Sequence, residues 1–274
     1  MNRAKSSNSF QLIADSRCNV PPWLLRRYDI QCIPVSYYAK DRPESELLFQ
    51  ADASFDFSLL SSELEHGRSF NASPLNGDLC LRFIESSLDL EQKNIFFLYT
   101  SAAGSAKEDD VHAYFEYLAS TYPEHNFLAV DTLSSGLGFA RLLMRVGDMR
   151  IEGCEMHMLA HWIKESRLQK VQWFIRGAEE PLLHLNNSGK LVSPPDQPTW
   201  DSLLEVYKQR SELPYGSGGV SIAHVGNWQA AQKLADLLNY YFKVENPMIY
   251  DAEPSLAIAL GPKALALSFW GNPR

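Results

Sequence analysis

The 274-residue sequence is poor in positive charge, has no long apolar run and contains no C-x-x-C cysteine pair. It carries 25 Lys and Arg against 33 Asp and Glu, which gives a formal net charge of −8. A nucleic-acid backbone or an anionic membrane surface is therefore not expected as the main partner. No stretch approaches the roughly 18 apolar residues that a membrane span needs, so we expect no membrane-spanning segment.

The four cysteines, Cys18, Cys32, Cys80 and Cys154, are far apart in the sequence. Such spacing is typical of isolated thiols in a reducing compartment rather than of a disulfide framework or a zinc site. The first ten residues are polar and lack the apolar core of a signal peptide. These features favour a cytoplasmic location.

Several motifs that mark catalytic and cofactor sites are also missing. The sequence has no G-x-G-x-x-G dinucleotide pattern, no P-loop and no G-x-S-x-G nucleophile elbow. His157 and His161 have metal-ligand spacing on a predicted helix, but no third ligand is evident. Asp131 with Ser134 and Ser135 precedes a predicted helix, where a helix cap is favoured over a phosphate loop. We expect neither an enzyme nor a cofactor or metal site.

What the sequence does contain is a set of short apolar strands that each end in polar residues. The three runs span residues 11–14, 95–99 and 127–130, and a helical pattern follows each of them. This alternation predicts parallel βαβ units, whose strands end at one shared edge of the sheet. Loops at that edge commonly form a ligand crevice. The polar residues that directly follow the runs are Asp15 and Ser16, Thr100 and Ser101, and Asp131 and Thr132.

The segments between these units are less regular. Residues 30–37 alternate loosely and contain Pro34, which predicts an edge strand. Residues 39–55 and 70–74 are polar or turn-rich and are interpreted as loops. Residues 76–88 form an amphipathic helical pattern in which Leu79 is among the buried candidates.

Strands cluster after Lys170, with fewer helices between them. A helix that begins after Asn227 is expected to bury a face that runs from Trp228 to Tyr241. The apolar run 256–260 is interpreted as a strand. We therefore predict an α/β protein with two domains, a parallel-sheet domain at residues 9–155 and an α+β domain at residues 156–274.

Eight short motifs occur in an order that resembles the DegV family of bacterial fatty-acid-binding proteins. Their positions extend from residue 10 to residue 271, nearly the whole chain, and each motif is weak on its own. The motifs are Ile13-Ala14-Asp15-Ser16, the strand ending at Val35, Ser73-Pro74, Tyr99 to Ala106, Val130-Asp131-Thr132, Glu180 to Val192, the helix after Ile222 to Asn227, and Gly261 to Leu267.

The resemblance implies a non-catalytic carrier that holds a long acyl chain in a tunnel between its two domains. It further implies that hydroxyl and amide side chains and backbone N–H groups hold the head group, and that a separate fatty-acid kinase acts on the bound lipid. Carried onto this sequence, the ligand-binding residues are Asp15, Ser16, Asn71, Ser73, Thr100, Ser101, Gly104 and Ser105.

The sequence departs from the family pattern around the head group. Asn71 and Ala72 replace a Thr-Ser pair, Ala106 replaces a Thr, and Ala259 stands where the family has a His. The G-G-R stretch that the family uses towards the kinase is absent. A buried carboxylate with fewer donors costs several kcal/mol unless it binds protonated. An amide, ester or alcohol head group therefore also suits the site.

Two alternatives remain beside a lipid carrier. One is a regulatory or protein-interaction module that has the same fold and has lost lipid binding. The other is an enzyme that acts on a small phosphorylated or acidic substrate, against which the missing motifs argue.

Overall fold

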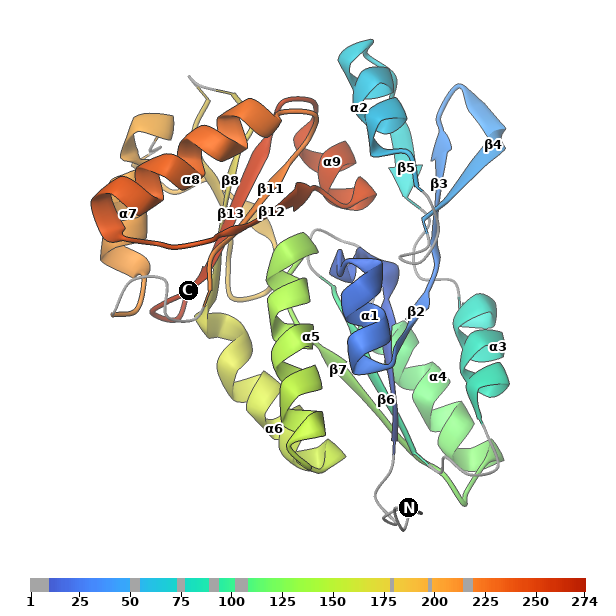
Figure 1. Ribbon diagram of the computed structural model, residues 1–274. Coiled ribbons are helices and arrows are strands. Elements are labelled where there is room, and N and C mark those ends of the chain that lie inside the picture. Colours follow the sequence, from blue (N-terminus) through green and yellow to red (C-terminus); the bar gives the residue numbers. More distant parts are fainter. Residues whose placement is uncertain are drawn as a thin grey trace.

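The computed structural model describes residues 10–49, 55–72, 77–88, 94–101, 108–177, 180–196, 199–213 and 219–274. Its two main sheets lie on either side of helix α5 (Gly136–Ile151), with the parallel sheet at one end of the molecule and the mixed sheet at the other (Figure 1). None of the described helices is both long and apolar enough to cross a membrane.

The N-terminal sheet has the order β2-β1-β6-β7, and all of its strand pairs are parallel. This arrangement confirms the predicted βαβ sheet, with the opening strand β1 in an inner position. The strands are β1 (Phe10–Asp15), β2 (Ile30–Ile33), β6 (Asn94–Tyr99) and β7 (Asn126–Asp131). The helices are α1 (Pro22–Tyr28), α3 (Gly77–Ser87), α4 (Glu108–Thr121), α5 and α6 (Met156–Ser166).

Alternate residues of each parallel strand enter two different cores. Ile13 and Phe97 pack with the helices α3 and α4, whereas Leu12 and Phe96 pack with α1, α5 and α6. Because side chains alternate across a strand, a strand buried on both faces is apolar throughout. This accounts for the uninterrupted apolar runs in the sequence.

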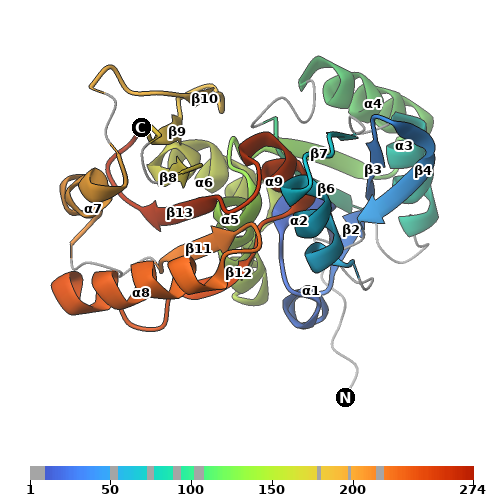
Figure 2. The same ribbon diagram turned by 90° about the horizontal axis from the view of Figure 1, so that it is seen from above.

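The C-terminal sheet has the order β10-β9-β8-β13-β11-β12 and is mixed, with only β11 and β12 parallel. Helices α7 and α8 contribute to the core on one face, and α5 and α9 to the core on the other (Figure 2). This confirms the expected α+β half. The elements are β8 (Lys170–Ile175), β9 (Leu183–Leu185), β10 (Leu191–Val192), α7 (Leu203–Arg210), β11 (Ser221–His224), α8 (Trp228–Phe242), β12 (Met248–Asp251), α9 (Pro254–Leu260) and β13 (Leu265–Trp270).

A third, antiparallel sheet of order β4-β3-β5 corrects three of the sequence predictions. The expected edge strand breaks at Pro34, so that Val35–Ala39 forms β3 in this separate sheet. Arg42–Phe49 is the strand β4 and Phe70–Ala72 is the strand β5, although both segments were expected to be loops. Each pairs with β3. β4 follows β3 directly in a hairpin, whereas β5 comes after helix α2 (Phe57–Glu65). In both cases pairing with β3 decides the structure, which the polar composition of the segment does not reveal.

The predicted strand 256–260 is instead the helix α9. Glu253 caps it by accepting the backbone N–H groups of Ser255 and Leu256, and Pro254 occupies the first turn. A short apolar run fits a buried helix as well as a strand, and here the capping residues decide the outcome. The predicted buried faces of α3 and α8 also included exposed residues. Leu79 on α3 is exposed, as are Trp228 and Tyr241 on α8.

Polar contacts join α5 to both sheets. On the parallel-sheet side, Arg150 donates to the carbonyl of Phe10, 3.0 Å away. On the other side, Arg141 donates to the hydroxyl of Ser221 at 2.7 Å, and Gln172 of β8 hydrogen-bonds both backbone groups of Ser135. The helix therefore fixes the two sheets relative to each other.

The contact between α1 and α5 predicts the effect of one substitution. A Cβ atom added at Gly147 would lie 2.4 Å from the ring of Tyr28, which is buried against α5. Ala normally stabilises a helix interior relative to Gly by about 1 kcal/mol. Because of the overlap, we expect Gly147→Ala to lower the free energy of unfolding by about 1–3 kcal/mol instead. Urea denaturation measures this loss. Gly147→Ala should cost less when it is made in a Tyr28→Val background, where the overlapping ring is gone.

Candidate functional site

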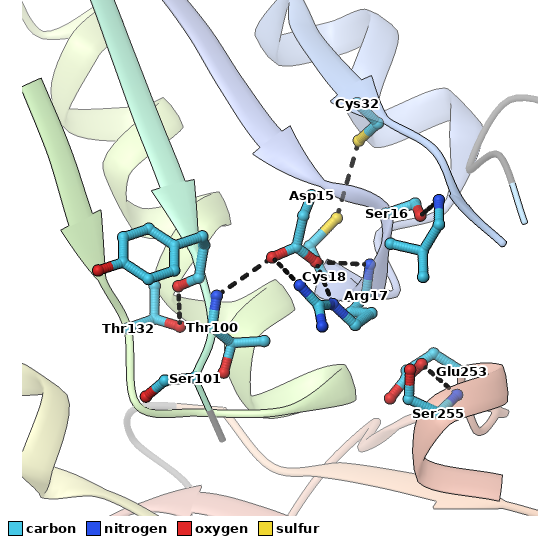
Figure 3. Close-up of polar contacts among 12 residues, drawn as sticks. Asp15, Ser16, Arg17, Cys18, Cys32, Thr100, Ser101, Thr132, Glu253 and Ser255 are labelled. Atoms are coloured by element: carbon cyan, nitrogen blue, oxygen red, sulfur yellow. Dashed lines mark hydrogen bonds and ion pairs between the residues drawn. The ribbon is translucent and has the colours of Figure 1, made fainter. Parts of the chain in front are cut away.

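The carboxyl ends of β1, β6 and β7 meet at one edge of the parallel sheet. Asp15 ends β1, and Thr100 and Ser101 follow β6 (Figure 3). Asp131 ends β7. Asp15, Thr100 and Asp131 are buried. The side chains of Asp15 and Thr100 lie in the region where helix α9 approaches the sheet. The structure thus brings together Asp15, Ser16, Thr100 and Ser101 of the predicted site.

Asp15 forms a buried ion pair with Arg17, a residue that was not among the predicted site residues. Arg17 Nε donates to Oδ1 of Asp15 at 3.0 Å, and Nη2 donates to Oδ2 at 3.3 Å. The backbone N–H of Thr100 donates to the same carboxylate at 3.1 Å. Burial lowers the pKa of Arg17, but the charge and hydrogen bonds of Asp15 raise it by more, so the guanidinium stays charged. The pair joins the loops after β1 and β6.

Asp131 organises the loop after β7 in a similar way. Its carboxylate accepts the hydroxyl of Ser101 at 2.5 Å, the backbone N–H of Ser101 at 3.1 Å and that of Leu133 at 2.9 Å. Leu133 has φ +50°, a left-handed conformation that non-glycine residues seldom adopt. The hydrogen bond to Asp131 helps to hold that conformation, and the Ser101 hydroxyl is already donating within the protein.

Ser16 has a structural contact at this edge, because its Oγ accepts the backbone N–H of Val35 at 3.1 Å and so supports the turn into β3. The remaining predicted site residues are not brought to this edge by the described structure. Asn71 lies on β5 opposite Tyr38, with its side chain exposed. Ser73, Gly104 and Ser105 lie outside the described residues.

Helix α9 brings two further polar groups towards this edge. Glu253 is buried, and burial raises its pKa to about 7, while its capping bonds and Arg17 oppose that rise. Tyr37 OH and Ser255 Oγ share a hydrogen bond of 2.8 Å, and burial raises the pKa of Tyr37 well above its ordinary value. The phenol therefore stays protonated. The Glu-Pro cap of α9 was the sequence signal for this helix, and it was missed.

A direct hydrogen bond also joins the loop after β1 to the C-terminal half. Asn19 has φ +50° and donates its side-chain amide to the carbonyl of Asp251, 2.9 Å away. Asn tolerates this left-handed conformation better than most residues do. The short 3-10 helix Ser16–Cys18, which carries Arg17, is thus held between Asp15 and the C-terminal sheet.

The described residues contain no group of three His, Cys, Asp or Glu side chains that could hold a metal ion. His157 is largely exposed and lies 3.4 Å from Glu155. Among the described residues, cavities open elsewhere on the surface. One of about 490 Å³ lies beside Arg145 and Trp270, one of about 430 Å³ beside Trp200 and Asn227, and one of about 400 Å³ beside Leu25 and Cys32.

Single and double substitutions at the Asp15–Arg17 ion pair should have very different effects on stability. Asp15→Asn leaves the Arg17 charge buried without its carboxylate, so we expect a loss of about 3–5 kcal/mol in the free energy of unfolding. The double variant Asp15→Asn with Arg17→Met removes both charges and should lose markedly less. Chemical denaturation of the unsubstituted protein, the two single variants Asp15→Asn and Arg17→Met, and the double variant measures the coupling energy of the pair. Equal losses in the single and double variants would show that the pair does not hold the edge.

Glu253 predicts how stability depends on pH. The folded protein keeps this proton up to a pH of about 7, whereas the unfolded chain releases it near the ordinary value of 4.5. Between these values the unfolded state binds fewer protons, so stability falls as the pH rises, by roughly 3 kcal/mol in total. Glu253→Gln should remove this decline when unfolding is measured from pH 4.5 to 8. The exposed Glu165→Gln should leave it unchanged.

No protein-family model and no curated protein matches the sequence. Solved structures match nearly its full length. DegV from Bacillus subtilis, a fatty acid binding protein, is 12% identical with a TM-score of 0.78, over 97% of this chain and 100% of its own. A DegV family protein from Eubacterium eligens loaded with heptadecanoic acid is 16% identical with a TM-score of 0.74, over 96% of this chain and 100% of its own.

A third match is the fatty acid kinase (Fak) B3 protein of Streptococcus pneumoniae loaded with linoleic acid. It is 15% identical with a TM-score of 0.73, over 96% of this chain and 100% of its own. At such identities the likeness shows the fold alone. The chain has the two-domain DegV fold that its sequence motifs predicted.

Proposed function

We propose that this chain is a divergent DegV-type protein that binds a fatty acid or a related lipid without chemically changing it. The observation that carries the proposal is a full-length match to proteins loaded with heptadecanoic and linoleic acids. The proposal includes a carrier role in the cytoplasm and a division into domains at residues 9–155 and 156–274. It leaves out a kinase partner, because the G-G-R stretch is absent from this sequence.

The proposed head-group site lies between the edge of the parallel sheet and helix α9. Arg17 and Thr100 belong to the sheet side, and Ser255 belongs to α9 (Figure 3). The hydroxyl groups of Tyr37 and Ser255 form a hydrogen-bonded pair towards α9. A hydroxyl can donate one hydrogen bond and accept others, so this pair has capacity left for an oxygen of the ligand. The predicted residues Asp15, Ser16, Asn71, Ser73, Ser101, Gly104 and Ser105 complete the proposed site.

The charges around this site limit the head group. Asp15 and Glu253 are buried carboxyl groups, and Arg17 is paired with the first of them. An ionised ligand carboxylate would add another negative charge to a water-poor region, which is costly. A protonated acid, an alcohol, an amide or an ester avoids this cost. We therefore propose that the lipid binds with an uncharged head group.

One observation favours the second candidate, an interaction module that has lost the ligand. The Ser101 hydroxyl donates to Asp131, and the Arg17 side chain is 1% exposed at the edge where the head group would lie. Engaged donors and a bulky buried side chain are also what a closed site would contain.

Native mass spectrometry of freshly purified protein separates the two candidates. A carrier should show an adduct of a few hundred daltons that disappears on denaturation, and the released molecule identifies the head group. A clean apo mass that is unchanged by a fatty acid, a fatty alcohol and a monoacylglycerol would contradict lipid binding and favour the interaction module.

A matched pair of substitutions tests the site itself. Ser255 belongs to the hydroxyl pair of the proposed site, so Ser255→Ala should weaken lipid binding roughly tenfold through the loss of one hydrogen-bonding group. In Thr132→Val the lost hydroxyl donates to the carbonyl of Tyr99, an internal contact, so the affinity should stay within about twofold even though stability falls. Displacement of a fluorescent fatty acid measures both variants. Equal affinities for the two would place the head group elsewhere.

A further inference from the structure

Two of the cysteines that are far apart in sequence lie next to each other in the fold. Cys18 is the last residue of the short 3-10 helix after β1, and Cys32 lies on β2. Their sulfur atoms are 3.9 Å apart (Figure 3). A disulfide requires about 2.05 Å, so the two sulfurs need to approach by about 1.9 Å. All four thiols are free, as expected, but Cys18 and Cys32 are neighbours in the fold and not isolated from each other.

An oxidant has a route to one member of the pair. Cys32 is partly exposed and lines the cavity of about 400 Å³ between α1, β2 and Phe83, whereas Cys18 is fully buried behind it. This arrangement suits a two-step reaction in which the accessible thiol is oxidised and the buried thiol resolves it. Cys80 is a useful contrast, because burial raises its pKa to about 12 and keeps its thiol protonated and unreactive.

We propose that Cys18 and Cys32 are an oxidation site that closes reversibly to an intramolecular disulfide. With a peroxide as the oxidant, Cys32 gives up two electrons to the O–O bond and becomes a sulfenic acid, and one water molecule leaves. The sulfur of Cys18 then attacks the sulfenic sulfur, the S–S bond forms and a second water molecule leaves. In total, two thiols and one peroxide give one disulfide and two waters.

The location of the pair connects this chemistry to the proposed lipid site. Cys18 follows Arg17 directly, and Asn19 holds the same segment to the carbonyl of Asp251. Drawing Cys18 towards β2 displaces both neighbours, because the 3-10 helix is only three residues long. Oxidation should therefore change lipid affinity, a consequence that rests on the proposed function. The disulfide itself does not depend on that function.

Peptide mapping of the full-length protein tests the disulfide. Reduced protein is freed of reductant, treated with hydrogen peroxide, denatured, alkylated and digested with trypsin without reduction. Cleavage after Arg17, Arg26, Arg27 and Lys40 places the two thiols in separate peptides, residues 18–26 and 28–40. We expect these peptides to be linked and the intact mass to fall by about 2 Da, the two hydrogens lost, with full reversal by dithiothreitol.

Two Cys→Ser substitutions test the assignment. Cys32→Ser should abolish the mass loss, and Cys154→Ser, at the other partly buried cysteine, should leave it unchanged. The proposal is overturned if both thiols remain open to alkylation after oxidation, or if Cys32 gains oxygen without linking to Cys18. Lipid affinity of the reduced and oxidised forms is measured alongside. Absence of lipid binding in both forms would contradict the proposed function and leave the disulfide result standing.

Discussion

The buried ion pair between Asp15 and Arg17 is the interaction on which the edge of the parallel sheet depends. The carboxylate accepts two guanidinium hydrogen bonds and the backbone N–H of Thr100, which belongs to the loop after the neighbouring strand. A buried charge is tolerated only when it is paired and hydrogen-bonded, so the positions of these groups are strongly coupled. Two loops that are more than 80 residues apart in sequence are held in one arrangement.

The second constraint is the shared helix α5, which lies between the two main sheets (Figure 1). Its apolar side chains, among them Phe139 and Leu143, belong to one core that includes residues of both sheets. Gln172 fixes its first turn and Arg150 its last turn. The site at the sheet edge is thus built on a rigid frame, because helix α5 is packed on both sides.

The proposed functions of the site and of the thiol pair meet in one short segment. Residues 15–19 contribute the central carboxylate, its guanidinium partner, a buried thiol and the amide that reaches the C-terminal half. Glu253 faces this segment from α9, and its raised pKa reflects both burial and the nearby Asp15 charge. A change of charge or of covalent bonding in this segment therefore reaches both halves of the molecule.

Much of the fold was readable from the sequence, for physical reasons that are local. Strands buried on both faces require continuous apolar runs, and this identified β1, β6 and β7 with their polar ends. Four predicted site residues met at one edge because parallel strands end together. The order of short motifs then predicted the two-domain fold that the solved structures share.

The sequence alone determined the class of fold, the parallel sheet and the edge where polar residues gather. Only the tertiary structure decided that residues 70–72 are a strand paired with β3, and that Glu253 and Cys32 come close to the segment that carries Asp15, Arg17 and Cys18. The reason is that periodicity reports which side chains are buried within one element. Which strand pairs with which, and which buried charges face one another, depends on contacts between residues remote in sequence.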